Sequence, residues 1–254
     1  MMSKILTRRS VLAGLAVSAP ALLAGCDRLG AEPAFRASFL SWGEWLNYRT
    51  HRLLFANSLA PEFTEAEMSP VFRTNGNETA GDPIYRKHLA EGFVNWRLEV
   101  GGLVARPLRL SLADLKAREQ RTQITEHTCV EGWTAIGKWT GVPLWSILAE
   151  AAVAPDACYI VFHCADDFRG TPYYESIDMV DAMHPQTILA YGMNGADLPE
   201  RHGAPVRLRV ERQLGYKHAK FVMRIEAVSD LAALGKGRGG YWEDAGQYAW
   251  YAGI

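Results

Sequence analysis

The sequence of 254 residues has no large excess of charge of either sign, since 27 Lys and Arg stand against 28 Asp and Glu. Nucleic-acid-binding proteins normally carry a basic excess or a basic stripe, and disordered tails carry lopsided charge. Internal repeats, low-complexity tracts and the motifs CxxCH, CxxC and HxxxH are also absent. Those motifs hold haem and zinc. We therefore expect a folded globular protein with no nucleic-acid partner and with none of these groups bound through a standard motif.

The first 26 residues contain no acidic residue. A basic start followed by an apolar stretch over 11–24 is typical of an export signal. Within it, ThrArgArgSerValLeu at 7–12 resembles a twin-arginine motif, which exports proteins that fold before they cross the membrane. LeuAlaGlyCys at 23–26 resembles a bacterial lipobox. We predict a twin-arginine signal peptide with a lipobox over 1–26, a periplasmic protein and a lipid anchor to the inner membrane on Cys26. Plain signal cleavage is the alternative.

Beyond the signal, segments with strand-like patterns outnumber helical ones. Residues 27–95 contain four prolines and a turn signal, so we expect this part to be loop-rich. Strands are predicted at 96–104, 123–129, 158–164, 187–191, 205–211 and 220–228, and helices at 112–118 and 143–153. This order predicts an α+β fold of mixed β-sheets with short helices. We expect 27–95 and 96–254 to form one domain.

Cysteines are few beyond the signal: Cys129, Cys158 and Cys164. Cys158 and Cys164 lie in one strand-like run, where six residues separate their Cα atoms by roughly 20 Å, beyond the limit of about 7 Å for a disulfide. They should not pair with each other. Cys129 ends a predicted strand and enters a loop with glycines and tryptophans, which presents it at a surface. It is a metal ligand, a nucleophile or a buried structural cysteine, and it can join either other cysteine only if the fold brings them together.

Four segments resemble, in order, the sulfite oxidase superfamily. They are CysValGluGlyTrp at 129–133 with TrpThrGlyValProLeu at 139–144, the segment 183–195, HisGlyAlaProValArgLeu at 202–208 and GlyTyrLysHisAlaLys at 215–220. The resemblance is closest to the branch of periplasmic, molybdopterin-dependent methionine sulfoxide reductase catalytic subunits. It implies a molybdopterin cofactor that carries molybdenum, bound by a domain of the sulfite oxidase type.

The resemblance assigns the reacting centre to two residues of the first segment. Cys129 matches the cysteine whose thiolate binds molybdenum, and a soft sulfur ligand suits a metal that already carries the two sulfurs of a pterin dithiolene. Glu131 matches an acid near the metal in the reductase branch, where it positions a water or moves a proton. We therefore predict Cys129 and Glu131 as catalytic residues, with Cys129 as the metal ligand.

The resemblance also implies a set of residues that bind the pterin, whose phosphate needs cationic or amide donors. They are Arg73, Thr74, Asn75, Cys164, His202, Arg207, His218, Ala219 and Lys220. His202 stands where the reductase branch has Asn and sulfite oxidases often have His. Cys164 stands where the reductase branch has Thr. The predicted cofactor shell is therefore intermediate between the two branches.

The implied function is oxygen-atom transfer by a molybdenum-dependent enzyme. The primary prediction is reduction of a small sulfoxide-type substrate with electrons from a membrane b-type haem subunit. Sulfite oxidation by a sulfite dehydrogenase is the alternative, and a non-enzymatic periplasmic lipoprotein on the same fold is the second alternative. The chain ends soon after the last segment, without the immunoglobulin-like dimerisation domain of many sulfite oxidases, so we expect a monomer.

Overall fold

The structure, a computed structural model, describes residues 33–254, so the predicted signal peptide and Cys26 lie outside the described residues. The chain divides into two compact units between Leu54 and Phe55. Helix α2 (Pro33–Phe55) belongs to the first unit except for its last residue. The sequence predicts a loop-rich segment over 27–95, whereas α2 alone is 23 residues long. Its first turn has no acidic residue and Arg49 interrupts its apolar positions, so the usual helix signals are weak.

The second unit alternates strands with short helices. Its elements are, in order, η1 (Glu65–Glu67), α3 (Pro83–Ala90), β1 (Arg97–Gly102), β2 (Leu108–Ser111), α4 (Leu112–Lys116), β3 (Arg121–Cys129), β4 (Trp133–Pro143), α5 (Leu144–Ala151), β5 (Tyr159–Phe168), β6 (Thr171–Asp178), α6 (Met179–Ala182), β7 (Ile188–Met193), β8 (Ala196–Asp197), η2 (Glu200–His202), β9 (Arg207–Arg209), η3 (Gly215–Lys217), β10 (Val222–Val228) and α7 (Tyr241–Gly246).

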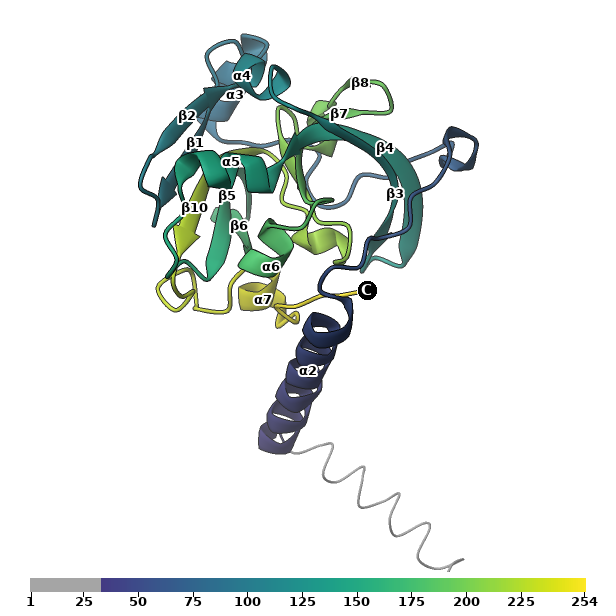
Figure 1. The fold of residues 1–254 in the computed structure, drawn as a ribbon, viewed down its shortest axis with the longest axis vertical. Helices are drawn as coiled ribbons and strands as arrows, with labels where there is room; N and C mark the ends of the chain where they lie inside the picture. The colour runs from purple at the N-terminus through teal and green to yellow at the C-terminus, as the bar shows by residue number, and fades with distance from the viewer. Residues whose placement is uncertain (1–32) are drawn as a thin grey trace, which may run out of the picture. The chain divides into compact units, whose positions relative to one another are not determined.

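The strands form two sheets (Figure 1). One has the order β2-β1-β10-β5-β6, in which β1 and β10 are parallel and the other neighbours are antiparallel. The other has the order β3-β4-β7-β8, with β9 paired to β7, and is antiparallel throughout. The prediction of an α+β fold with mixed sheets and short helices is confirmed.

The main core draws side chains from both sheets and from the helices between them. Leu98 of β1, Leu115 of α4, Ile147 of α5, Phe162 of β5 and Leu189 of β7 all belong to one buried cluster. Burying a side chain of this size contributes about 2 kcal/mol. Because the cluster takes side chains from both sheets, it packs the two sheets against each other.

Strand β4 occupies a segment in which the sequence predicts a loop. Its glycines and tryptophans obscure the alternation, but the structure gives each glycine a packing reason. A Cβ on Gly141 would lie 2.3 Å from the carbonyl oxygen of Leu189 in β7, so only glycine allows this close approach of the strands. Trp139 is fully buried beside it.

Candidate active site

The motif CysValGluGlyTrp is a tight hairpin between β3 and β4. The turn 130–132 joins Cys129 to Trp133, which face each other in the ladder. Gly132 has φ +84°, a left-handed conformation that glycine adopts without strain, and its N–H donates to the Cys129 carbonyl at 3.1 Å. The sequence predicts Cys129 at a surface, whereas it is only 6% exposed. It lines a cavity inside the second unit instead.

This cavity collects residues from distant parts of the chain. Its polar lining consists of Asn75, Asn77, Cys129, Glu131, Asp166, His218 and Lys220. Its aromatic lining consists of Phe168, Tyr173, Tyr216, Trp242 and Tyr248. Five of the residues predicted for the site therefore meet here, because the sheets bring the ends of their segments together.

The surroundings of Cys129 act on its thiol in opposite directions. Burial raises the pKa of the Cys129 thiol, and the nearby carboxylate of Glu131 adds to this, while backbone N–H groups of Val130 and Glu131 oppose it by hydrogen bonding to the sulfur. Glu131 is exposed and accepts a hydrogen bond from the indole N–H of Trp133 at 3.0 Å. A bound cation would favour the thiolate, as expected of a metal ligand.

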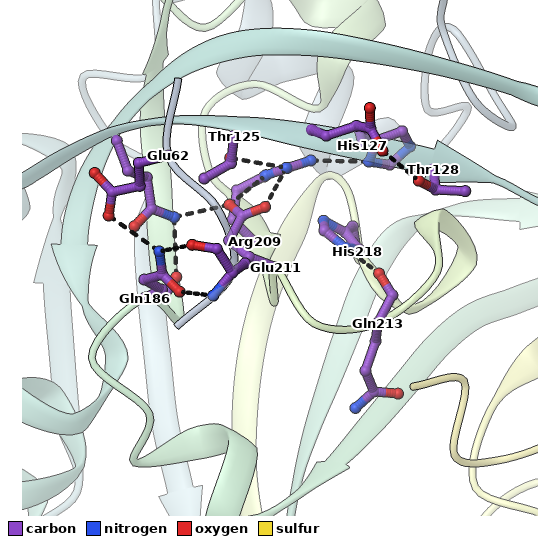
Figure 2. A network of polar contacts seen from close by, with 12 residues as sticks. Glu62, Thr125, His127, Thr128, Gln186, Arg209, Glu211, Gln213 and His218 are labelled. Carbon is purple, nitrogen blue, oxygen red and sulfur yellow. Dashed lines mark hydrogen bonds and ion pairs between the residues drawn. The ribbon is translucent and has the colours of Figure 1, made fainter. Parts of the chain in front are cut away.

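Two arginines of β9 are buried against Trp139, and neither is part of the cavity lining. The sequence places Arg207, Arg209 and Glu211 on the polar face of an alternating strand, but the structure buries all three. The guanidinium carbons of Arg207 and Arg209 lie 5.0 and 4.4 Å from the ring centroid of Trp139. Arg209 donates to Glu211 and, at 2.8 Å, to Nδ1 of His127, as Figure 2 shows. Arg209 was not among the predicted site residues. Its position two residues after Arg207, on the same face of the strand, is the signal that could have identified it.

Arg207 has no acidic partner among the described residues. It donates to the carbonyls of His202 at 3.1 Å and His218 at 3.4 Å, and its Nε is buried without a partner in residues 33–254. Burial, with Arg209 nearby, lowers the pKa of Arg207 to about 9. In this part of the chain, Oδ1 of Asn75 and Nδ1 of both histidines are also buried without partners. A buried cation and unused polar atoms fit an anionic group with many hydrogen-bonding atoms, such as a pterin with its phosphate.

The histidines near these arginines are held neutral. Burial lowers the pKa of His127 and the pKa of His218 well below the ordinary value. The charges of the two arginines lower both pKa values further, and the charge of His218 also lowers the pKa of His127. Burial and Arg207 lower the pKa of His202 to about 4. The ring centroids of His127 and His218 are 4.9 Å apart. Neutral imidazoles supply one donor and one acceptor each, which suits contacts with a heterocycle.

Lys220 connects the cavity to two loops. Its ammonium donates to the carbonyls of Asn77 and, at 3.0 Å, Arg201. Burial and the charge of Arg207 lower the pKa of Lys220 to about 7. Asp166 accepts a hydrogen bond from Asn77 at 3.0 Å, and burial raises the pKa of Asp166 to about 6. An anion bound here would favour the charged form of Lys220.

Other predicted residues lie elsewhere. Arg73 is exposed and Thr74 is half-buried, and neither lines the cavity, whereas the next residue, Asn75, does. Cys164 lies on β5 and lines a separate cavity beside Tyr173, and burial raises the pKa of its thiol well above the ordinary value. Ala219 is fully buried and accepts a hydrogen bond from the N–H of Leu208. The three described cysteines are unpaired, as the spacing predicts for two of them.

The neutral state of His202 predicts how stability depends on pH. The folded pKa of about 4 lies below the ordinary 6.5, so the stabilising effect is complete above pH 6.5 and is lost as the pH falls toward 4. This loss amounts to about 3 kcal/mol. Between pH 7 and pH 4 the free energy of unfolding of the cofactor-free wild type should fall by about 3 kcal/mol more than that of cofactor-free His202→Asn. Urea denaturation at the two pH values measures both changes. An equal loss in both proteins would contradict the buried, neutral assignment.

Comparison with known proteins gives this site a family. Residues 87–233 match the oxidoreductase molybdopterin binding domain. The chain is 38% identical, over 98% of its length and 86% of the relative's, to an Azospira oryzae protein provisionally named protein-methionine-sulfoxide reductase subunit YedZ1. It is 31% identical, over 79% of its length and 68% of the relative's, to the protein-methionine-sulfoxide reductase catalytic subunit MsrP of Ralstonia nicotianae.

A solved structure, the sulfane dehydrogenase SoxCD of Paracoccus pantotrophus, aligns with 54% of this chain and 39% of its own chain, at 27% identity and a TM-score of 0.49. The family match spans more than half of the 254 residues, and the Azospira oryzae relative exceeds 30% identity over almost the whole chain. The family predicted from the sequence is therefore confirmed: this chain belongs to the molybdopterin-binding oxidoreductases of the sulfite oxidase superfamily.

Proposed function

We propose that this chain is the catalytic subunit of a periplasmic enzyme that reduces an uncharged sulfoxide. One observation carries the choice of substrate: the charged residues that line the cavity are Lys220, Glu131 and Asp166, so the lining has no cationic excess. A site for the sulfite anion would be expected to be cationic. Five aromatic side chains line the same cavity, and aromatic rings attract the apolar substituents of an uncharged substrate. The two relatives named as protein-methionine-sulfoxide reductase subunits support the same reaction.

Different residues of this chain would bind the cofactor and transfer protons. Cys129 would bind molybdenum through its thiolate, and Arg207, His218 and Lys220 would contact the pterin and its phosphate. When bound, the cofactor supplies the two-electron chemistry of oxygen-atom transfer. Two protons must accompany two electrons to turn the sulfoxide into a sulfide and water. Glu131 is exposed at the turn beside Cys129 and lines the cavity, and it would deliver a proton.

The electrons and the location belong to the same proposal. The sequence has no CxxCH motif for haem, and its GxGxxG run at 235–240 does not directly follow a strand as a dinucleotide-binding motif does. A partner must therefore bring the electrons, and we propose a membrane b-type haem subunit. The name of the Ralstonia nicotianae relative, a catalytic subunit, agrees with a multisubunit enzyme. Export by the twin-arginine route and a lipid on Cys26 would keep the enzyme beside that partner.

The test compares substrates in the molybdenum-loaded enzyme and in two tryptophan variants. With a reduced viologen as donor, we expect reduction of methionine sulfoxide and no oxidation of sulfite. Trp242→Leu should raise the KM for the sulfoxide about tenfold, because a large aromatic wall is lost. Its kcat and its molybdenum content should change little, since Trp242 supplies neither a metal ligand nor a charged group.

Trp145→Leu is the matched control, because Trp145 lies on α5, is 39% exposed and does not line the cavity. It should leave the KM unchanged. Sulfite oxidation without sulfoxide reduction would replace the proposal by the sulfite dehydrogenase alternative. Equal KM values in Trp242→Leu and the wild type would show that Trp242 does not contribute to substrate binding.

A further inference from the structure

Helix α2 exposes several large apolar side chains, and most of them gather on one side. Trp42, Trp45, Leu46 and Leu53 are between 53 and 82% exposed. With about 100° of rotation per residue, these four positions fall within an arc of about 100° around the helix. The exposed polar residues Ser41, Glu44 and Asn47 fall outside this arc, whereas Arg49 falls inside it and the exposed apolar Leu54 and Phe55 lie outside it. Exposed apolar stripes of this size normally mark a surface that another partner covers.

The charge of the helix favours an anionic partner. Residues 33–55 contain three arginines and one acid, a net charge of +2, whereas residues 27–254 as a whole have 24 basic and 28 acidic residues. The guanidinium carbon of Arg49 lies 5.6 Å from the ring centroid of Trp45, and that of Arg52 lies 5.2 Å from the ring of Tyr48. Arginines beside tryptophan and tyrosine rings are typical of helices at a membrane interface, where the rings sit at headgroup depth.

The helix is suited to lie on a membrane and not to cross it. Among residues 33–254, no helix has the length and apolar character that crossing a bilayer requires. An interfacial helix needs only one apolar side and a cationic component. Cys26 precedes Pro33 by seven residues, so a lipid on Cys26, as proposed above, would keep the start of α2 within about 25 Å of the bilayer.

We propose that α2 binds in the plane of an anionic phospholipid surface, with Trp42, Trp45, Leu46 and Leu53 inserted among the headgroups and Arg49 and Arg52 at the lipid phosphates. This contact is separate from the chemistry of the cavity. It would add to the membrane affinity that a lipid on Cys26 gives.

The test uses the molybdenum-loaded mature chain, residues 27–254, so that neither the signal nor a lipid contributes. We expect it to sediment with phosphatidylglycerol vesicles more than with phosphatidylcholine vesicles, and less at high salt because surface charges are screened. Trp42→Gln combined with Leu46→Gln should lower the partition coefficient at least about tenfold, because two inserted side chains are lost. Glutamine keeps helix propensity, and circular dichroism checks that the helix remains.

Ser41→Gln combined with Asn47→Gln is the matched control, since it adds the same two side chains outside the apolar arc. This control should bind like the wild type. A further readout needs no variant: the tryptophan emission of the wild type should shift to the blue when phosphatidylglycerol vesicles are added. A wild-type chain that stays in the supernatant, or a Trp42/Leu46 variant that binds like the wild type, would overturn the proposal, and neither result depends on whether Cys26 is lipidated or which substrate is reduced.

Discussion

Replacing Cys129 by Ser is expected to lower sulfoxide reduction at least about 100-fold, because loss of partners that merely orient a metal ligand already costs about 10-fold to 100-fold. Cys129 is the only cysteine on the lining of the cavity that contains Asn75, His218 and Lys220. A serine oxygen is a harder ligand than a thiolate and is protonated at neutral pH, so it replaces the sulfur poorly. Molybdenum and pterin content measured beside the rate will show whether the cofactor is lost or bound in an inactive form.

The control for this substitution is Cys158→Ser. Cys158 is exposed, precedes β5 and lines neither this cavity nor the neighbouring one at Cys164. Its rate and metal content should match the wild type. If Cys129→Ser reduced sulfoxides at the wild-type rate with full molybdenum content, the cavity at the β3–β4 hairpin would not be the reacting centre.

Much of the site could be predicted from the sequence because short motifs have fixed backbone consequences. Gly132 is a glycine because the turn after Cys129 needs a positive φ, so the motif keeps a constant shape around its cysteine. The pairing of Cys129 with Trp133 then determines which way the thiol points. Asn75, His218 and Lys220, which residue matching selected without any knowledge of the sheets, all line this cavity.

Other parts could not be predicted from local pattern. The alternation of 205–211 indicates a polar face for Arg207 and Arg209, and only the tertiary structure shows that this face is buried against Trp139. Strand β4 was hidden because glycines that permit close strand contact look like loop residues. Helix α2 was hidden because arginines stand among its apolar positions.

The role of the C-terminal segment, residues 234–254, could not be predicted from motifs either, because it follows the range 87–233 that matches the family. Trp242 and Tyr248 from this segment nevertheless line the cavity. The segment is connected to the rest of the site by Lys217 of η3, one residue before His218. Its ammonium, fully buried, donates to the carboxylates of Glu175 and, at 2.7 Å, Glu243 of α7. This buried group of three charges joins β6, η3 and α7.

Removal of the Lys217 cation is expected to destabilise the fold strongly. Lys217→Met should lower the free energy of unfolding by about 3–5 kcal/mol, because two buried carboxylates lose their counter-charge. Urea denaturation at neutral pH measures this change. Lys138→Met is the matched control, because its ion pair with Glu65 is partly exposed, and a loss of about 1 kcal/mol or less is expected there. Similar losses in the two variants would mean that the three buried charges do not hold the segment.

The loss in Lys217→Met should also depend on pH in a defined direction. Burial, and then repulsion by Glu243, raises the pKa of Glu175 well above 4.5, and Lys217 opposes this rise. Without Lys217 the folded pKa of Glu175 rises further. A carboxyl group with a raised folded pKa contributes fully to stability below the unfolded value and loses that contribution as the pH increases. The stability difference between the variant and the wild type should therefore be smallest near pH 4.5 and grow toward neutral pH. A difference that stayed constant, or that shrank as the pH increased, would show that the variant suffers from lost packing and not from uncompensated charge.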